Sequence, residues 1–242
     1  MIERTNNKLF LSRVELNKNA PISTLKTLID PGDPNKALDA HHRLIWTLFP
    51  GPDYNRDFLW RAEGNGTFYI LSSRIPTNPG LFKPISTKEF SPVLKPGNNL
   101  VFSLRLNATK DKSIPREERG QKSRQRVDLV MDKLRDIPHK EGTEGNIPNT
   151  RAELRLKIAN EVSNSWLLKK GNGSGFVPTN VICNDYSVRK IPRGKNNHVT
   201  IGVLDITGII TIEEPKIFVE TLRKGFGRAK AFGCGLMLIR RA

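Results

Sequence analysis

The 242-residue sequence predicts an α+β fold with two tandem domains. Two observations lead to this prediction. Segments in which apolar and polar residues alternate, as they do in half-buried strands, occur between segments whose apolar residues recur at helical spacing. The order of strands and helices in roughly the first hundred residues also recurs, with small changes, in the rest of the chain. A chain of this length can bury two cores of ordinary domain size, so we expect one domain in each half.

The first half is predicted to contain four strands and one helix. In chain order these are strand 8–16, helix 36–49, strands 58–64 and 67–75, and strand 99–109. The helix ends at Pro50, and Gly64-Asn65-Gly66 is typical of a hairpin turn between the second and third strands. A proline-rich stretch stands where a second helix would follow. The order β-α-β-β-x-β predicts a ferredoxin-like (RRM-like) N-terminal domain, residues 1–110.

A basic junction, residues 111–148, is predicted to follow, with one short helix at 126–137. The second domain is then expected at 149–242. Its predicted elements are helix 150–170, strands 176–191 and 198–212, helix 213–224 and strand 235–241. This order predicts a second ferredoxin-like domain, whose initial strand the sequence does not reveal.

The formal net charge of +16, from 40 Lys and Arg against 24 Asp and Glu, favours a polyanionic partner. Nucleic acid comes first and an acidic membrane surface second. No apolar run reaches the roughly 20 residues of a membrane span, and the N-terminus lacks a signal-peptide layout, so a cytoplasmic protein is expected. Cys183 and Cys234 are far apart and suit packing rather than a zinc site.

A glycine-rich basic segment, GFGRAKAFGCG at residues 225–235, lies close to the C-terminus. It does not match a dinucleotide fingerprint, because Lys230 replaces the third glycine, or a P-loop, because Ala231 follows that lysine. One interpretation is a connector whose glycines allow a tight path. The other is a cradle for a nucleic-acid backbone, with glycine N–H groups near phosphate and Arg228 and Lys230 as cations. Seven Lys or Arg and one acid in residues 216–242 favour the cradle.

Together these segments resemble one family. The pattern Gly-x-Gly, a basic middle containing alanine, and Gly-x-Gly-Leu before a terminal strand is similar to the C-terminal motif of CRISPR repeat-processing endoribonucleases, specifically the CasE family of the type I-E Cascade system. Three other segments match in their expected order, namely HRLIWTLFP (42–50), RDFLW (56–60) and LKPGNNLVFSLRLNATK (94–110). The resemblance runs from the first strand to the last residue and is weakest at 111–150.

The resemblance implies an activity and partners. Members of this family are metal-independent RNA-cleaving enzymes with two ferredoxin-like domains, so the resemblance implies neither a metal nor a cofactor. They cut a stem-loop CRISPR repeat on the 3′ side of the stem and usually keep the product within the surveillance complex. We therefore expect repeat stem-loop RNA and other Cascade subunits as partners, and no membrane. Attack by the RNA 2′-hydroxyl would leave a 2′,3′-cyclic phosphate and a 5′-hydroxyl.

The resemblance places the family's catalytic histidine at His42, and the adjacent His41 competes with it. At about 100° per residue, His41 shares the centre of the apolar face of the predicted helix, whereas His42 lies at its margin. His41 is therefore expected to pack in the core, and His42 to be partly exposed and to transfer a proton, as base or as acid. Several family members have a tyrosine three residues earlier, where this chain has Asp39. Asp39 would either orient His42 or be a solvated carboxylate in the first turn.

Basic residues in three places are expected to bind RNA: beside the histidine, on a hairpin and in the glycine-rich segment. A thin basic hairpin could follow the phosphates of A-form RNA, whose narrow major groove excludes a helix, although a solvated loop explains the same residues. The full predicted set is Arg43, Arg189, Lys190, Arg193, Lys195, Gly225, Gly227, Arg228, Lys230, Gly233 and Gly235. The basic run from Lys110 to Arg126 is a poorer candidate, because acidic residues offset it.

Two other functions compete with the endoribonuclease. A non-catalytic RNA-binding subunit of a ribonucleoprotein would use the same fold with both histidines in structural roles. A DNA-binding or membrane-surface protein would explain the charge but neither the glycine-rich segment nor His42.

Overall fold

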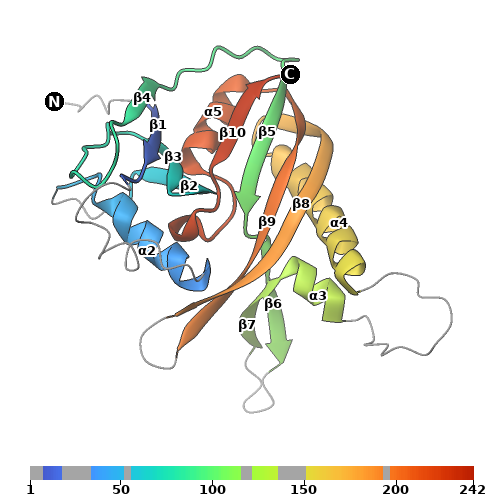
Figure 1. The fold of residues 1–242 in the computed structure, drawn as a ribbon. Helices are drawn as coiled ribbons and strands as arrows, with labels where there is room; N and C mark the ends of the chain where they lie inside the picture. Colours follow the sequence, from blue (N-terminus) through green and yellow to red (C-terminus); the bar gives the residue numbers. More distant parts are fainter. Residues whose placement is uncertain (1–7, 18–33, 52–55, 116–121, 136–150, 193–196) are drawn as a thin grey trace.

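A computed structural model describes residues 8–17, 34–51, 56–115, 122–135, 151–192 and 197–242 of the chain (Figure 1). The elements are β1 (Phe10–Glu15), α2 (Pro34–Trp46), β2 (Phe58–Gly64), β3 (Thr67–Ser72), β4 (Ser86–Glu89), β5 (Asn99–Leu106), β6 (Thr109–Pro115), β7 (Lys122–Asp128), α3 (Leu129–Arg135), α4 (Arg151–Gly171), β8 (Phe176–Pro192), β9 (His198–Ile212), α5 (Pro215–Lys224), the 3-10 helix η2 (Lys230–Phe232) and β10 (Met237–Arg241). In these residues the strands form two four-stranded antiparallel sheets and a separate hairpin, which confirms the predicted α+β class.

The first sheet has the strand order β2-β3-β1-β4, with α2 across one face (Figure 1). Because side chains alternate along a strand, Trp60 and Phe68 point to that face and share a core with Leu44 of α2 and with Leu48 in the turn after it. Residues 73–85 contain no helix, as the sequence predicted for this ferredoxin-like unit.

The fourth strand of the first sheet is β4, which the sequence did not reveal. It pairs with β1, with Phe10 opposite Glu89 and Arg13 opposite Ser86. Its sequence, Ser-Thr-Lys-Glu, has no apolar residue, so it lacks the alternation that identifies a half-buried strand.

The second sheet has the equivalent order, β10-β5-β9-β8, so β5 is one of its central strands. Asn99 of β5 lies opposite Thr211 of β9, and Leu104 lies opposite Met237 of β10. The expectation that this strand completes the N-terminal domain is therefore wrong. It is the initial strand of the second unit, and alternation identified it as a strand without specifying partners far along the chain. We propose that the N-terminal domain ends between β4 and β5 rather than at residue 110.

Helices α4 and α5 cover the second sheet and lie close to the predicted ranges 150–170 and 213–224 (Figure 1). Val162 of α4 and Phe218 of α5 share one core with Phe102 of β5. The second unit thus has the element order β-α-β-β-α-β of the ferredoxin-like fold, which confirms the predicted fold class.

The junction contains more structure than the sequence predicted. β6 and β7 form a hairpin, and the helix expected at 126–137 begins later, at Leu129. Asp128 explains this start, because its Oδ1 accepts the N–H groups of Val130 at 2.9 Å and Met131 at 3.0 Å. A carboxylate in this position caps a helix.

Strands β8 and β9 continue beyond their sheet as a two-stranded ribbon that reaches α2 (Figure 1). Leu38 of α2 packs against Ile191 and Ile201 of the ribbon. Asn35 Oδ1 of α2 accepts the backbone N–H of Lys190 at 2.9 Å. The first unit therefore lies against the ribbon of the second.

The two sheets are also joined directly. Arg61 of β2 donates from Nη1 to Ser103 Oγ of β5 at 2.9 Å, and Arg105 of β5 donates from Nη1 to the Ala62 carbonyl at 2.9 Å. Arg105 is held in turn by Asp205, at 2.9 and 3.0 Å. A cluster of leucines packs beside these contacts: Leu9, Leu59, Leu71 and Leu236. None of the described helices has the length and apolar character needed to cross a membrane.

Candidate functional site

Helix α2 carries both histidines, and the structure gives them different surroundings. His41 points at the first sheet, where its ring makes edge-on contacts with Phe68, at a centroid distance of 4.9 Å, and with Trp60, at 6.2 Å. Both partners are fully buried. These contacts agree with the packing role predicted for His41, whose side chain is half-buried rather than buried.

His42 lies beside His41 at the margin of the packed face and is partly exposed. Its Nε2 accepts a hydrogen bond from the indole N–H of Trp46 at 3.0 Å. An indole nitrogen can only donate, so Nε2 must present its lone pair, and the neutral ring carries its proton on Nδ1. Trp46 is itself held by an edge-on contact with Phe58, at a centroid distance of 5.0 Å.

Sequence reasoning did not identify Trp46 as a functional residue. The available signal was its spacing, because residues four apart on a helix lie on the same side and their side chains can meet. The segment that carries the family resemblance contains Trp46, but the resemblance assigned no role to it.

Asp39 lies one turn before His42, and its carboxylate forms an ion pair with Arg43. The Arg43 side chain is 79% exposed, whereas the Asp39 side chain is 22% exposed. Asp39 is thus a partly buried carboxylate whose charge is paired with Arg43, the residue that follows His42.

The glycine-rich loop packs against β2, the strand whose Trp60 contacts His41. A Cβ atom at Gly225 would lie 2.7 Å from the Leu59 side chain, and one at Gly233 would lie 3.1 Å from the Trp60 ring. Both glycines have positive φ, 73° and 76°. A side chain would therefore be strained and crowded at either position, which supports the connector interpretation for these glycines.

The backbone of the loop divides into two parts. The N–H groups of Phe226, Cys234 and Gly235 donate to carbonyl oxygens inside the protein, at 2.9, 3.4 and 2.8 Å. For the N–H groups of residues 227–231, by contrast, no acceptor is found in the described part of the chain. This arc is thus available to an external acceptor such as a phosphate oxygen.

The two cations of the loop already have protein partners. Arg228 pairs with Asp111 of β6 at 3.1 Å, and its hydrogen bond and charge lower the pKa of that carboxyl group. The Lys230 ammonium group donates to the Lys224 carbonyl at the end of α5, at 2.6 Å. Both contacts are compatible with exposure to a ligand, because Arg228 remains 44% exposed and Lys230 is only half-buried.

The predicted elements meet around α2. The glycine-rich loop contributes Phe232 to the same apolar cluster as Leu38 of α2 and Ile191 of the ribbon. Lys190 is exposed and Arg189 is half-buried at the α2 end of the ribbon, while Arg193 and Lys195 lie outside the described residues. α2, the loop and the ribbon therefore form one region.

The cysteines and the acidic side chains do not suggest a redox or metal site. Cys183 and Cys234 are free and buried, as expected for packing residues, and burial raises the pKa of Cys234 to about 12. Among the residues that the structure describes, no three His, Cys, Asp or Glu side chains are placed to share a metal ion.

Comparison with known proteins identifies the family. The family model described as "CRISPR associated protein" matches residues 9–241. The chain belongs to this family. It is 27% identical over 206 residues to the CRISPR system Cascade subunit CasE of Escherichia coli K12, covering 81% of this chain and 88% of CasE. This match confirms the resemblance to CasE.

Solved structures of the family share the fold. Cas6e of E. coli K-12 matches with a TM-score of 0.64 and 22% identity, over 96% of this chain and all of Cas6e. Cse3 of Thermus thermophilus, bound to an RNA representing a pre-cleavage complex, matches with a TM-score of 0.62 and 20% identity, over 96% of this chain and 99% of Cse3. The fold of this chain is thus the two-domain ferredoxin-like fold of Cas6e.

Proposed function

We propose that this protein is an endoribonuclease that cleaves CRISPR repeat stem-loops in precursor RNA to make mature guide RNA. One observation supports the proposal: a partly exposed histidine, whose Nε2 accepts a hydrogen bond from Trp46, lies on α2, the helix that packs against both the basic ribbon and the glycine-rich loop. Membership of the family supports the substrate class. The relatives are named as a Cascade subunit and as an RNA-bound Cse3, which supports repeat RNA and other Cascade subunits as partners.

The proposed reaction uses the nucleophile of the RNA itself. His42 acts as general base and accepts the proton of the 2′-hydroxyl, whose oxygen attacks the adjacent phosphorus. The bond to the 5′-oxygen breaks, and that oxygen takes up a proton. The products are a 2′,3′-cyclic phosphate and a 5′-hydroxyl. The charge that develops on the phosphate is stabilised by cations and N–H groups rather than by a metal ion.

The hydrogen bond from Trp46 supports the choice of base rather than acid. It favours a neutral imidazole with the lone pair on Nε2, the form that accepts a proton. The substrate hydroxyl would replace the indole N–H at this lone pair, because both are donors to the same atom.

The proposed RNA-binding groups are Arg43, the ribbon residues Arg189, Lys190, Arg193 and Lys195, and Arg228, Lys230 and glycines 225, 227, 233 and 235 of the loop. The N–H groups of residues 227–231, for which the described part of the chain offers no acceptor, support a role of the loop backbone in phosphate binding. The glycines themselves act by giving the loop its path.

The decisive experiment incubates the purified protein with a stem-loop repeat RNA in chelator. We expect cleavage with a 2′,3′-cyclic phosphate and a 5′-hydroxyl at the new ends. Binding without cleavage, with or without added Mg²⁺, would favour the non-catalytic RNA-binding subunit.

The matched control replaces the single ribose upstream of the scissile phosphate by deoxyribose. This RNA should bind and remain intact, because the attacking group is absent while fold and charge are kept. A metal-activated water would tolerate that change and leave different ends. Cleavage of the deoxy RNA, or activity that requires Mg²⁺, would contradict the proposed mechanism.

A further inference from the structure

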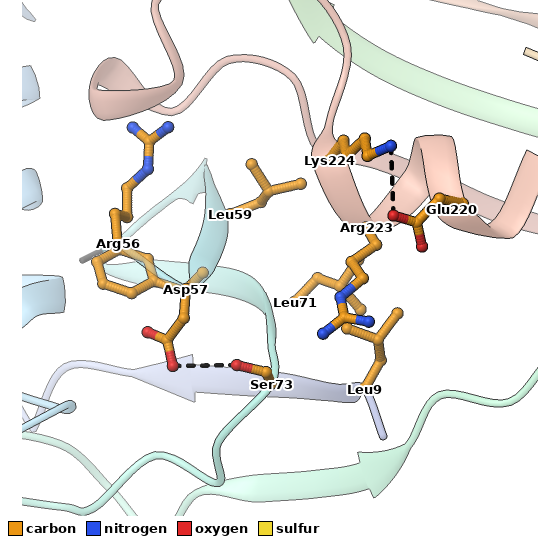
Figure 2. Close-up of a pocket in the computed structure, with 10 residues that line it drawn as sticks. Leu9, Arg56, Asp57, Leu59, Leu71, Ser73, Glu220, Arg223 and Lys224 are labelled. Carbon is orange, nitrogen blue, oxygen red and sulfur yellow. Dashed lines mark hydrogen bonds and ion pairs between the residues drawn. The ribbon is translucent and has the colours of Figure 1, made fainter. Parts of the chain in front are cut away.

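A cavity of about 280 Å³ lies between the first sheet and α5, beside the leucine cluster that joins the two sheets (Figure 2). Its apolar wall includes Leu9, Leu59 and Leu71. Figure 2 shows the Arg223 side chain extending from α5 toward Leu9 and Leu71. The cavity thus combines an apolar floor with cationic sides, and it is distinct from the surroundings of His42.

The groove continues along α5. A second cavity, of about 340 Å³, shares Leu9, Glu220 and Arg223 with the first and adds Lys216 at the start of the helix. The two cavities together follow one side of α5 from its last turn to its first.

The acidic groups of the first cavity already have cationic partners. Asp57 accepts two hydrogen bonds from Arg74, at 2.6 and 3.0 Å, and Glu220 pairs with Lys224 at 3.4 Å. The cationic side chain of Arg56, by contrast, has no partner of opposite charge there: among the described residues no carboxylate lies within ion-pair distance of it. In that part of the chain its guanidinium is therefore a cation without a counter-ion.

Arg56 also connects the cavity with the glycine-rich loop. Burial lowers the pKa of Arg56. Burial likewise lowers the pKa of Lys230, and the charges of Arg56 and Lys170 lower it further. The positive charges of Arg56, just before β2, and of Lys170, at the end of α4, thus both act unfavourably on the Lys230 ammonium group of the loop. An anion bound among them would relieve both the repulsion and the loss of hydration.

We propose that this cavity binds a phosphodiester segment of single-stranded RNA that continues from the stem-loop. The proposal rests on the proposed function, because it places the flanking strand relative to the bound stem. A duplex is too wide for a cavity of this volume, whereas one unpaired nucleotide can contact the leucines with its base and the arginines with its phosphate. Continuity of positive charge from Lys230 to Arg56 and Arg223 favours RNA over an acidic protein segment.

The test measures the contribution of a single-stranded tail to affinity. The protein carries His42→Ala so that the RNA stays intact, and the probes are a repeat stem-loop alone and with a ten-nucleotide oligouridylate tail at either end. We expect one tail to raise affinity at least fivefold at low salt, and Arg56→Ala/Arg223→Ala to remove most of that gain. The tail should also steepen the plot of log affinity against log salt concentration. In the variant, the slope of that plot should become less steep by about 0.7 for each phosphate that is no longer neutralised.

A matched control removes two other arginines. Arg240 and Arg241 are exposed on β10 and line neither cavity, so Arg240→Ala/Arg241→Ala should keep the gain from the tail. An equal loss in both double variants would mean a general charge effect and would overturn the proposal. The proposal would also be overturned if neither tail raised the affinity of the protein that retains Arg56 and Arg223.

Crosslinking gives a readout that does not depend on the variants. With 4-thiouridine in the tail, the crosslinked peptides should include residues 56–59, 71–73 or 220–224. Crosslinks confined to other surfaces would contradict the proposed site. A different result would contradict the proposed function: the wild-type protein would fail to cleave the stem-loop, with or without a tail.

Discussion

At the scale of single residues, the hydrogen bond from Trp46 to His42 constrains the chemistry most. It fixes which imidazole nitrogen has a lone pair and in which direction that lone pair points. Trp46→Phe removes the N–H group and keeps an aromatic ring against Phe58. We expect single-turnover cleavage to slow by about tenfold or more, while RNA affinity changes by less than about twofold, because without the indole donor the imidazole of the free protein shifts toward the Nε2–H tautomer, which cannot accept the hydroxyl proton at that atom.

A spectroscopic readout separates this role from a structural one. ¹⁵N NMR of the imidazole should show Nε2 as the unprotonated nitrogen in the wild-type protein and a shift toward the Nε2–H tautomer in Trp46→Phe. Slower cleavage with unchanged imidazole resonances, or with a lower melting temperature, would indicate that Trp46 only supports packing.

His42→Ala is expected to abolish cleavage and to leave RNA affinity within a few fold, because one neutral side chain contributes little to a largely electrostatic interface. Added imidazole should restore part of the activity by replacing the missing base. Loss of affinity in parallel with activity, without rescue, would argue against a catalytic role.

His41→Ala should instead lower the free energy of unfolding by about 1–3 kcal/mol, because its ring packs against two buried aromatic side chains. Thermal or urea unfolding measures this change. An unchanged stability together with lost cleavage would exchange the roles of the two histidines.

At the scale of elements, the glycine-rich loop has separable roles in folding and binding. Arg228→Ala and Lys230→Ala should weaken binding to all RNAs and reduce the salt slope by up to about one for each phosphate left without its cation. Gly233→Val should mainly lower the melting temperature, since Gly233 has positive φ and faces the Trp60 ring. A wild-type salt slope in the double alanine variant would leave the loop as a connector only.

The elements also show where sequence reasoning succeeds and where it stops. Alternation located β5 and the long ribbon, and helical spacing located α2, because these patterns are local. β4 was not found because all of its residues are polar, and the start of α3 was misplaced because the Asp128 cap was not recognised. The contact of Trp46 with His42 was accessible from spacing alone, whereas the cavity beside α5 was not, because its walls come from segments more than 100 residues apart.

At the scale of the whole molecule, the position of β5 predicts where the chain can be divided. β5 lies between β9 and β10, and its residues Leu100, Phe102, Leu104 and Leu106 are all buried. A fragment of residues 95–242 keeps this strand, whereas a fragment of residues 111–242 would leave β10 without a partner, leave β9 paired with β8 alone, and open the core under α4 and α5. We expect the longer fragment to unfold cooperatively on heating and the shorter one to lack a transition.

The contacts between the two sheets limit how stable the second domain can be when it is isolated. In the 95–242 fragment, Leu236 is no longer covered by the leucines of the first sheet, and Arg105 no longer has the Ala62 carbonyl as an acceptor. The isolated fragment should therefore melt below the full chain, and adding residues 1–94 as a separate chain should raise its melting temperature. Matching circular dichroism melts of the 111–242 and 95–242 fragments would contradict the assignment of β5 to the second domain, because removal of a central strand cannot leave the stability of its sheet unchanged.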